Sequence, residues 1–278
     1  MFPFISDSAI ENNLESTVLT FFPHPRTILN PDKPLKLINS VKERTDHLKN
    51  SKVDNLIIHP FDKSFSELDP EKYVVEILVK KLKAKIILIG YDHKFGKNRT
   101  ADISDLKEYG QKYGFKVIEI KAEEISNIAI SSTKIRKAIS EGNISTAKKY
   151  LGYDFSLSGR IVRGNSIGRT LGFPTANVEV KEEYKLLPKN GVYLIQSIID
   201  HNEYFGMMNI GIKPTLNKSS KTIEVNLFEF EGDLYNKKIT VSIKQFIRDE
   251  IKFESLDLLK SQIQKDKVNC NSIIDIID

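Results

Sequence analysis

The sequence predicts two domains of different fold class: an α/β doubly wound (Rossmann-like) domain, then an all-β small closed barrel that ends in a C-terminal helix. In the first half, short apolar runs alternate with amphipathic segments, the pattern of a parallel sheet covered by helices. After Tyr150 the pattern changes to short strands separated by turns, which favours a small barrel. The 278 residues suffice for two domains that each bury a core. We place the boundary at Gly152, so the expected domains are residues 1–152 and 153–278.

The elements of the first half follow from the spacing of apolar residues. Pro70–Leu82 carries apolar residues at helical intervals and begins with proline, a favourable first helical residue. Further helices are expected at Asp105–Tyr113 and Thr133–Ser140. Short apolar runs bounded by turn residues are typical of buried strands. Such runs are found at Thr17–Phe22, Asn55–Ile58, Lys85–Ile89 and Phe115–Ile120.

The second half consists of short strands joined by turns. Turn-forming residues separate the strands, for example at Asp200–Asn202 and Glu231–Asp233. Beyond the last strand, Leu256–Lys265 has the spacing of an amphipathic helix. The expected strands are Leu157–Val162, Gly191–Asp200, Phe205–Ile210, Thr222–Phe230 and Ile239–Phe246.

Composition excludes several classes of protein. The 42 lysine and arginine residues only slightly exceed the 37 acidic residues, which suits anionic small molecules but is too weak to indicate nucleic acid. No apolar run reaches the length of a membrane span, and the N-terminus lacks the regions of a signal peptide. The single Cys270 excludes an internal disulfide and fits a reducing compartment. We therefore expect a cytoplasmic protein whose partners are small molecules rather than nucleic acid or membranes.

The most informative stretch is Gly159–Asn177, in which glycines alternate with arginines before the run closes on Pro-Thr-Ala-Asn. Glycine lets backbone amides approach an oxyanion, and the arginine fork matches phosphate. Thr175 and Asn177 are two residues apart, so on an extended segment both side chains face the same way. Their neutral oxygens suit a Mg²⁺ ion that also holds water and phosphate. On glycine spacing alone, a hairpin with solvated arginines is the more ordinary interpretation.

The complete string is more specific than its spacing, because it resembles the ATP-binding segment of riboflavin kinases. The resemblance extends over the chain to the bacterial family of bifunctional riboflavin kinases/FMN adenylyltransferases, or FAD synthetases. It implies that Thr175 and Asn177 hold Mg²⁺. The ATP-binding residues that it implies are Gly164, Arg169, Gly172 and Pro174.

Glu224 is the candidate catalytic base. Apolar residues alternate with polar ones from Ile223 to Leu227, so Glu224 lies on the polar face of the expected strand. A glutamate there is usually just solvated, but the resemblance implies that it deprotonates the ribityl 5′-hydroxyl for attack on the γ-phosphate of ATP. The resemblance also implies flavin contacts from Arg248 and Phe253. Without it, Arg248 would be expected in a surface ion pair with the neighbouring Asp249 or Glu250.

The first half resembles nucleotidylyltransferases in the segment Ile130–Arg136, I-S-S-T-K-I-R. At a helix start, its amides and hydroxyls would bind phosphate, although an ordinary N-cap is the alternative. The run Gly90–Arg99 follows a strand, as in FAD synthetases. His24 follows another strand end, where open α/β sheets bind ligands, but it is as readily a turn residue. The implied nucleotide-binding residues are Ser131, Ser132, Thr133, Arg136, Gly90, Asp92 and His24.

Enzymes of this family open with a strand and a G-x-F-D-G-x-H-x-G-H-type loop that binds the triphosphate, and no such string occurs in this sequence. The first strand of a doubly wound sheet is normally central and buried on both faces. Without it, the neighbouring strands lose a hydrogen-bond partner and expose apolar side chains. We therefore expect a truncated form of a longer protein, in which the adenylyltransferase half is inactive or severely weakened.

The resemblance thus implies an enzyme of FAD biosynthesis that converts riboflavin to FMN with Mg²⁺ and ATP, from a family that also adenylylates FMN to FAD. A nucleotidylyltransferase for another phosphorylated substrate would fit Ile130–Arg136 but not the barrel half. A flavin-binding regulatory protein without turnover would not need a base beside a metal site.

Overall fold

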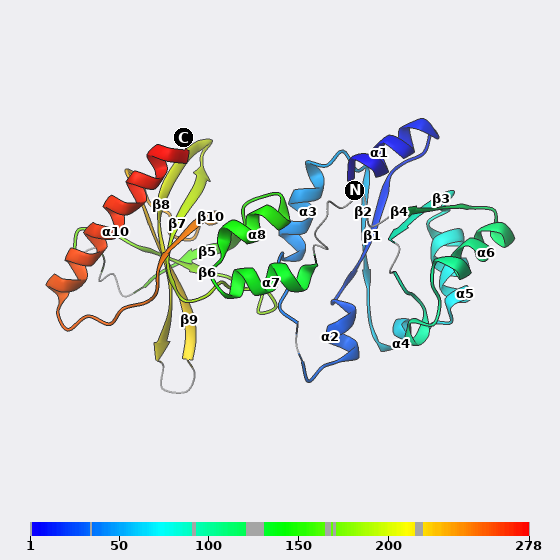
Figure 1. Cartoon of the computed structure of the whole chain (residues 1–278), viewed down its shortest axis with the longest axis horizontal. Coiled ribbons are helices and arrows are strands. Elements are labelled where there is room, and N and C mark those ends of the chain that lie inside the picture. The colour runs from blue at the N-terminus through cyan, green and yellow to red at the C-terminus, as the bar shows by residue number, and fades with distance from the viewer. Residues whose placement is uncertain are drawn as a thin grey trace. The chain divides into compact units, whose positions relative to one another are not determined.

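The computed structural model describes residues 2–33, 35–90, 93–120, 131–164, 168, 171–214 and 219–277. The chain divides into two compact units, Met1–Ile130 and Ser131–Asp278, each of which is described by itself (Figure 1). Helices α7 (Ser132–Ser140) and α8 (Ile144–Leu151) belong to the second unit, although sequence analysis placed their residues in the first domain. Both helices pack against the barrel. The Lys189 amide donates to the Ile139 carbonyl at 3.4 Å, and α8 contacts the last strand of the barrel.

The first unit contains all four predicted strands, arranged as two parallel pairs. Strand β1 (Thr17–Phe22) pairs with β2 (Asn55–Pro60), and β3 (Ile86–Gly90) pairs with β4 (Lys116–Ile120). The predicted α/β class with parallel strands is therefore confirmed. The helices of this unit are α1 (Phe2–Glu11), α2 (Pro25–Leu29), α3 (Val41–Lys49), α4 (Lys63–Ser66), α5 (Pro70–Tyr73), η1 (Val74–Lys81), η2 (Lys97–Arg99) and α6 (Ile103–Tyr113).

Local sequence explains where these helices begin and end. Asp102 caps α6, and the Asp105 carboxylate accepts from the Asp102 amide to complete a capping box. Gly114 ends α6 in the left-handed region at φ 75°, which glycine adopts without strain. The predicted helix Pro70–Leu82 is present as α5 followed by η1, whose turns are wider than those of an α-helix. Its apolar side supplies Val74, which is fully buried in the core of this unit.

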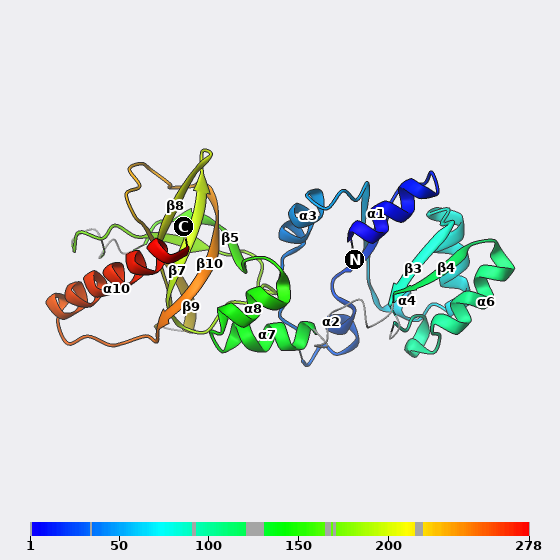
Figure 2. The ribbon, with the colours of Figure 1, turned by 45° about the horizontal axis from the view of Figure 1, so that its top comes forward.

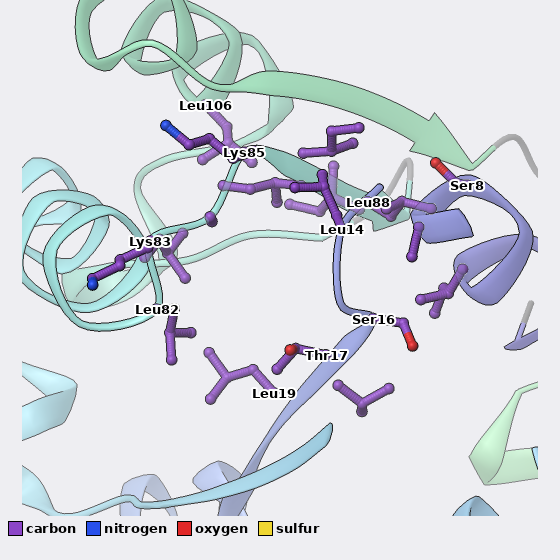
Figure 3. A pocket seen from close by; sticks show the side chains of 18 of the residues that line it. Ser8, Leu14, Ser16, Thr17, Leu19, Leu82, Lys83, Lys85, Leu88 and Leu106 are labelled. Carbon is purple, nitrogen blue, oxygen red and sulfur yellow. The ribbon is translucent and has the colours of Figure 1, made fainter. Parts of the chain in front are cut away.

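An open cleft separates β1 from β3. It has a volume of about 550 Å³ and is lined by Thr17–Leu19 of β1 and by Ile86–Gly90 of β3. Consecutive residues of a strand point to opposite faces, so a cavity that touches all of them meets the edge of the strand. Leu14, Leu82, Leu88 and Leu106 surround it (Figure 3).

Among the described residues, β1 pairs only with β2 and β3 pairs only with β4, and nearly all residues of the two strands are partly buried. Each of these strands therefore has one open edge among the described strands, as expected. The expected exposure of apolar side chains is not observed, because no large apolar side chain of β1 or β3 is exposed.

The second unit is a closed antiparallel barrel, as predicted, in the strand order β10-β5-β6-β9-β8-β7. A long helix, α10, lies along the outside of the barrel (Figures 1 and 2). The strands and helix are β5 (Ser156–Val162), β6 (Ala176–Glu179), β7 (Gly191–Ile199), β8 (Asn202–Pro214), β9 (Ser219–Leu227), β10 (Lys238–Arg248) and α10 (Leu256–Ile277).

Alternating side chains divide the barrel into an inner and an outer apolar layer. Tyr193, Ile195, Met208 and Ile210 are fully buried at every second position of β7 and β8, as expected for residues that fill a small barrel. On the opposite face, Leu194, Met207 and Phe228 pack with Cys270 of α10, together with Ile263, Ile273 and Ile274. Helix α10 is thus fixed to the outer surface of the barrel by apolar contacts on β7 and β8.

Candidate active site

The barrel carries a cavity of about 370 Å³ on the side covered by α10. Its size lies within the range of small-molecule sites. The wall is apolar where Met207, Ile251, Phe253 and Ile263 line it. Polar groups converge on the same space from β8, β9, β10 and α10, from the residue before β6 and from the segment after β10. These are Thr175, Asn209, Glu224, Asn226, Arg248, Glu250 and Asp266.

Strand register places Glu224 in a row of polar residues. Asn177 of β6 lies opposite Glu224 of β9, and Asn209 of β8 lies opposite Glu224 on its other side. Directly paired residues share a face of the sheet, so the carboxylate is flanked by two amides. Ile223 and Val225 point the other way and are 4% and 1% exposed. The alternation seen in the sequence is therefore observed, while the catalytic role of Glu224 remains a prediction.

The glycine-rich run packs closely against this row. A Cβ atom on Gly164 would lie 1.9 Å from Asn177 Nδ2, and one on Gly168 would lie 2.3 Å from the Phe173 carbonyl oxygen. Gly172 adopts φ +83°, in the left-handed region. The Phe173 amide donates to the Gly168 carbonyl at 2.8 Å. Close approach or φ therefore favours glycine at these three described positions of the run, and Gly164 lies directly against Asn177 of β6.

A hydrogen bond from β9 holds Pro174 in place. The Asn226 Nδ2 group donates to the Pro174 carbonyl at 2.7 Å, which ties the segment before β6 to β9. Thr175 lines the cavity directly after this contact. Of the predicted ATP-binding residues, Arg169 lies outside the described residues. The others, Gly164, Gly172 and Pro174, all belong to the segment that borders Thr175 and Asn177.

Arg248 forms an ion pair with a residue that sequence analysis did not consider. Its Nε donates to Asp266 Oδ1 at 2.9 Å, and one terminal nitrogen donates to Asp266 Oδ2 at 2.7 Å. The other terminal nitrogen donates to the backbone carbonyl of Asp249 at 2.8 Å. The expected pairing with the side chain of Asp249 or Glu250 is therefore wrong, because α10 brings a buried carboxylate within reach. Arg248 and Phe253 both line the cavity, consistent with the predicted position of a ligand.

The donor atoms around Glu224 fit a hard divalent cation. Thr175 offers a hydroxyl, Asn177 an amide oxygen and Glu224 a carboxylate, which are the oxygen ligands that Mg²⁺ accepts. Among the described residues, no group of three or more His, Cys, Asp or Glu side chains is arranged to hold a metal. A Mg²⁺ ion here would therefore take few protein ligands and would need oxygens from water or phosphate.

The nucleotide-binding residues predicted for the first half are distributed over both units. In the first unit, Gly90 ends β3, and His24 caps the five-residue helix α2 by accepting from the Arg26 amide at 3.1 Å. Asp92 lies outside the described residues. In the second unit, the Ser131 hydroxyl accepts from the Lys134 amide at the start of α7, which is the N-cap alternative. Ser132, Thr133 and Arg136 occupy the first turns of the same helix.

Among the polar residues of the barrel cavity, sequence reasoning did not predict Asn209, Asn226, Glu250 and Asp266 as site residues. Asn226 could have been found, because it shares the polar face of β9 with Glu224. Asn209 reaches Glu224 only through the pairing of β8 with β9, which no local pattern reports. Asp266 lies beyond the end of the helix predicted at Leu256–Lys265.

Family models match two consecutive parts of the chain. The model described as FAD synthetase matches residues 2–134, and the model described as riboflavin kinase matches residues 151–274. Together with the α/β unit, the closed barrel and its polar cavity, these matches define a two-domain transferase of flavin cofactor biosynthesis.

The chain belongs to the family of bifunctional riboflavin kinases/FMN adenylyltransferases. A relative from Buchnera aphidicola subsp. Schizaphis graminum is 42% identical over 260 residues, which cover 92% of this chain and 83% of the relative. A relative from Escherichia coli K12 is 33% identical over 265 residues, which cover 95% of this chain and 84% of the relative. Both carry the family name.

A solved structure described as a macrolide-efflux protein from Streptococcus pneumoniae shares the fold, with a TM-score of 0.87 and 33% identity over 97% of this chain and 88% of that one. That description concerns the Streptococcus protein alone. Within the part of this chain that the structure describes, we find no helix with the length and apolar character of a membrane span.

Proposed function

We propose that the second unit transfers the γ-phosphoryl group of ATP to the 5′-hydroxyl of riboflavin and that Glu224 is the general base. The observation that carries this proposal is the register that sets Glu224 between Asn177 and Asn209 at a cavity with one apolar wall. The apolar wall suits a flavin ring, and the polar row suits the reacting hydroxyl and phosphate. We place the boundary between the two catalytic domains at Gly152, next to residue 151, where the riboflavin kinase match begins.

Each residue has a distinct task in this mechanism. Glu224 accepts the proton of the attacking hydroxyl and orients its lone pair toward phosphorus. Gly164, Gly172 and Pro174, with Arg169, hold the phosphates of ATP against the backbone. Bound at Thr175 and Asn177, Mg²⁺ would supply charge neutralisation for the phosphates. Arg248 and Phe253 hold the flavin, with donors from the guanidinium and apolar contact from the ring.

The first unit is proposed to serve the second reaction of the family, the adenylylation of FMN. Gly90, Asp92 and His24 would bind nucleotide at the ends of parallel strands, the usual ligand position in open α/β sheets. By itself, the start of α7 in the second unit would supply donors to phosphate from Ser131, Ser132, Thr133 and Arg136. The substrates of the whole protein are then riboflavin, ATP and FMN, and no macromolecular partner is required.

The test of the kinase assignment is the Glu224→Gln variant. Wild-type and variant proteins are incubated with riboflavin, ATP and Mg²⁺, and the fluorescent flavins are separated by chromatography. We expect wild-type protein to form FMN and E224Q to lose at least about a hundredfold in kcat, because a general base contributes about 10²–10⁴. Riboflavin affinity, measured by fluorescence titration, should stay near the wild-type value. FMN formation by E224Q at the wild-type rate would refute the assignment, and wild-type protein that binds riboflavin without turnover would indicate the regulatory alternative.

A further inference from the structure

Asp266, a carboxylate on α10, holds the guanidinium of Arg248 at the wall of the cavity. The Arg248 Nε group donates to both carboxylate oxygens, at 2.9 and 3.0 Å, and the adjacent terminal nitrogen donates at 2.7 Å. The side chain of Asp266 is 5% exposed and that of Arg248 is 19% exposed. A two-point contact of this kind fixes the plane of a guanidinium, not only its distance.

The carboxylate is itself fixed from two sides. The Gln262 Nε2 group, one helical turn earlier, donates to Asp266 Oδ1 at 2.9 Å. Farther along the same helix, Cys270 is fully buried against Leu194 and Met207 of the barrel. Helix α10 therefore presents Asp266 to β10 in one position, since the apolar contacts on β7 and β8 prevent the helix from sliding.

Counting donors shows what Arg248 has left for a ligand. A guanidinium carries five N–H groups. Within the part of the chain that the structure describes, two are used by Asp266 and one by the carbonyl of Asp249, which leaves one on each terminal nitrogen. Without Asp266, the long side chain would gain rotamer freedom that a ligand would have to remove on binding.

We propose that Asp266 is a positioning residue for the flavin substrate, acting through Arg248: it orients the two remaining N–H groups toward an oxygen acceptor of riboflavin. The proposal rests on the proposed riboflavin kinase function and deepens it. Asp266 does not transfer a proton or contact the phosphates; its effect is confined to flavin binding. Substitution of Asp266 is then expected to raise the KM for riboflavin and to leave both kcat and the KM for ATP nearly unchanged.

The experiment is a double-mutant cycle at the two positions, with D266N, R248A and R248A/D266N assayed for FMN formation at varied riboflavin and at varied ATP. Asn keeps the shape of Asp but loses its charge, so D266N should raise the riboflavin KM about tenfold. The ATP KM and kcat should stay within about twofold of wild type. In the R248A background, D266N should have no further effect, because the guanidinium that it orients is gone.

The chain offers a matched control in a second ion pair of β10. Lys244 Nζ and Asp154 Oδ2 are 2.7 Å apart, both side chains are 17% exposed, and neither lines the cavity. D154N should lower thermal stability and leave both KM values unchanged. D266E keeps the charge and hence the fold, but its extra methylene displaces the guanidinium, so it should raise the riboflavin KM with little change in melting temperature.

Several results would overturn the role of Asp266. These are an equal rise in both KM values, the same rise in D154N, additive effects of D266N and R248A, or a wild-type riboflavin KM in D266E. Failure of the underlying function looks different: wild-type protein would form no FMN, or R248A itself would leave the riboflavin KM unchanged.

Discussion

Alanine in place of Gly164 is expected to disable phosphoryl transfer while leaving the barrel folded. A Cβ atom at this position would lie 1.9 Å from Nδ2 and 2.6 Å from Cγ of Asn177, whereas ordinary contacts begin at 3.4 Å. The Asn177 side chain must therefore move by about 1.5 Å. Because Asn177 is paired directly with Glu224, and a displacement of about 1 Å in a catalytic site can cost about a hundredfold, we expect kcat to fall at least that far.

The loss of activity should not come from unfolding. Gly164 is exposed and the contacted atoms are the end of a side chain, so the free energy of unfolding should fall by less than about 1 kcal/mol. The assay is steady-state FMN formation, with thermal unfolding followed in parallel. G152A is the matched control: Gly152 has φ +78° and nothing within 4 Å of an added Cβ. This variant should lose about 1–2 kcal/mol of stability, from strain alone, without loss of kcat. A G164A protein that keeps kcat within about threefold of wild type would refute the packing argument.

Three further outcomes are expected. Burial, and to a smaller extent the negative charge of Asp266, raises the pKa of Cys270 to about 12. The thiol of the native protein should therefore resist a disulfide reagent at pH 8 and should react when the protein unfolds. Rapid modification of the native protein would show that α10 leaves the barrel surface. Because the folded pKa of this thiol is the higher one, its contribution to stability is complete below about pH 8.5 and is lost as pH rises toward 12. Burial raises the pKa of Asp154, but hydrogen bonds from Lys148 and Lys244 outweigh burial and hold it below its usual value. The contribution of Asp154 to stability should be complete above about pH 4 and lost as pH falls further. The urea midpoint of D154N should therefore depend less on pH between 3 and 5 than the midpoint of the wild-type protein. The same pH dependence in both proteins would contradict this. Finally, because the edges of β1 and β3 are open to the cleft, their amides should exchange hydrogen faster than those of β7 and β8 in a hydrogen-exchange measurement. Equal protection of all four strands would contradict this.

Local sequence predicted the secondary structure well because each strand and helix is encoded by its own apolar spacing. All the predicted strands are observed, and Thr17–Phe22 has the predicted bounds. The short strand β6 (Ala176–Glu179) was not recognised as a strand, since only Val178 of its four residues is buried. Helix α10 was predicted to stop at Lys265 but continues to Ile277. The residues directly after Lys265 are polar and do not continue the apolar spacing of the helix. One of them, Asp266, is nevertheless buried, because it forms an ion pair with Arg248.

The candidate site was only partly predictable, for a related reason. Glu224, Thr175 and Asn177 belong to short motifs whose alternation fixes the face they occupy. Their neighbours depend on register and docking: Asn209 lies beside Glu224 because β8 pairs with β9, and Asp266 reaches Arg248 because α10 docks on the barrel. Such contacts between distant segments are properties of the tertiary structure. No single-sequence pattern contains them.

The cleft between β1 and β3 also bears on how this protein associates. Unpaired strand edges are templates for other chains, and proteins usually blunt them with charges, proline or a bulge. Here β3 reads Ile-Ile-Leu-Ile-Gly, with Lys85 immediately before it as the nearest charge. The described strands of the second unit have no comparable open edge, because their sheet closes on itself. Self-association at high concentration should therefore begin in the first unit, and molecules joined in this way would still carry an intact barrel and its cavity.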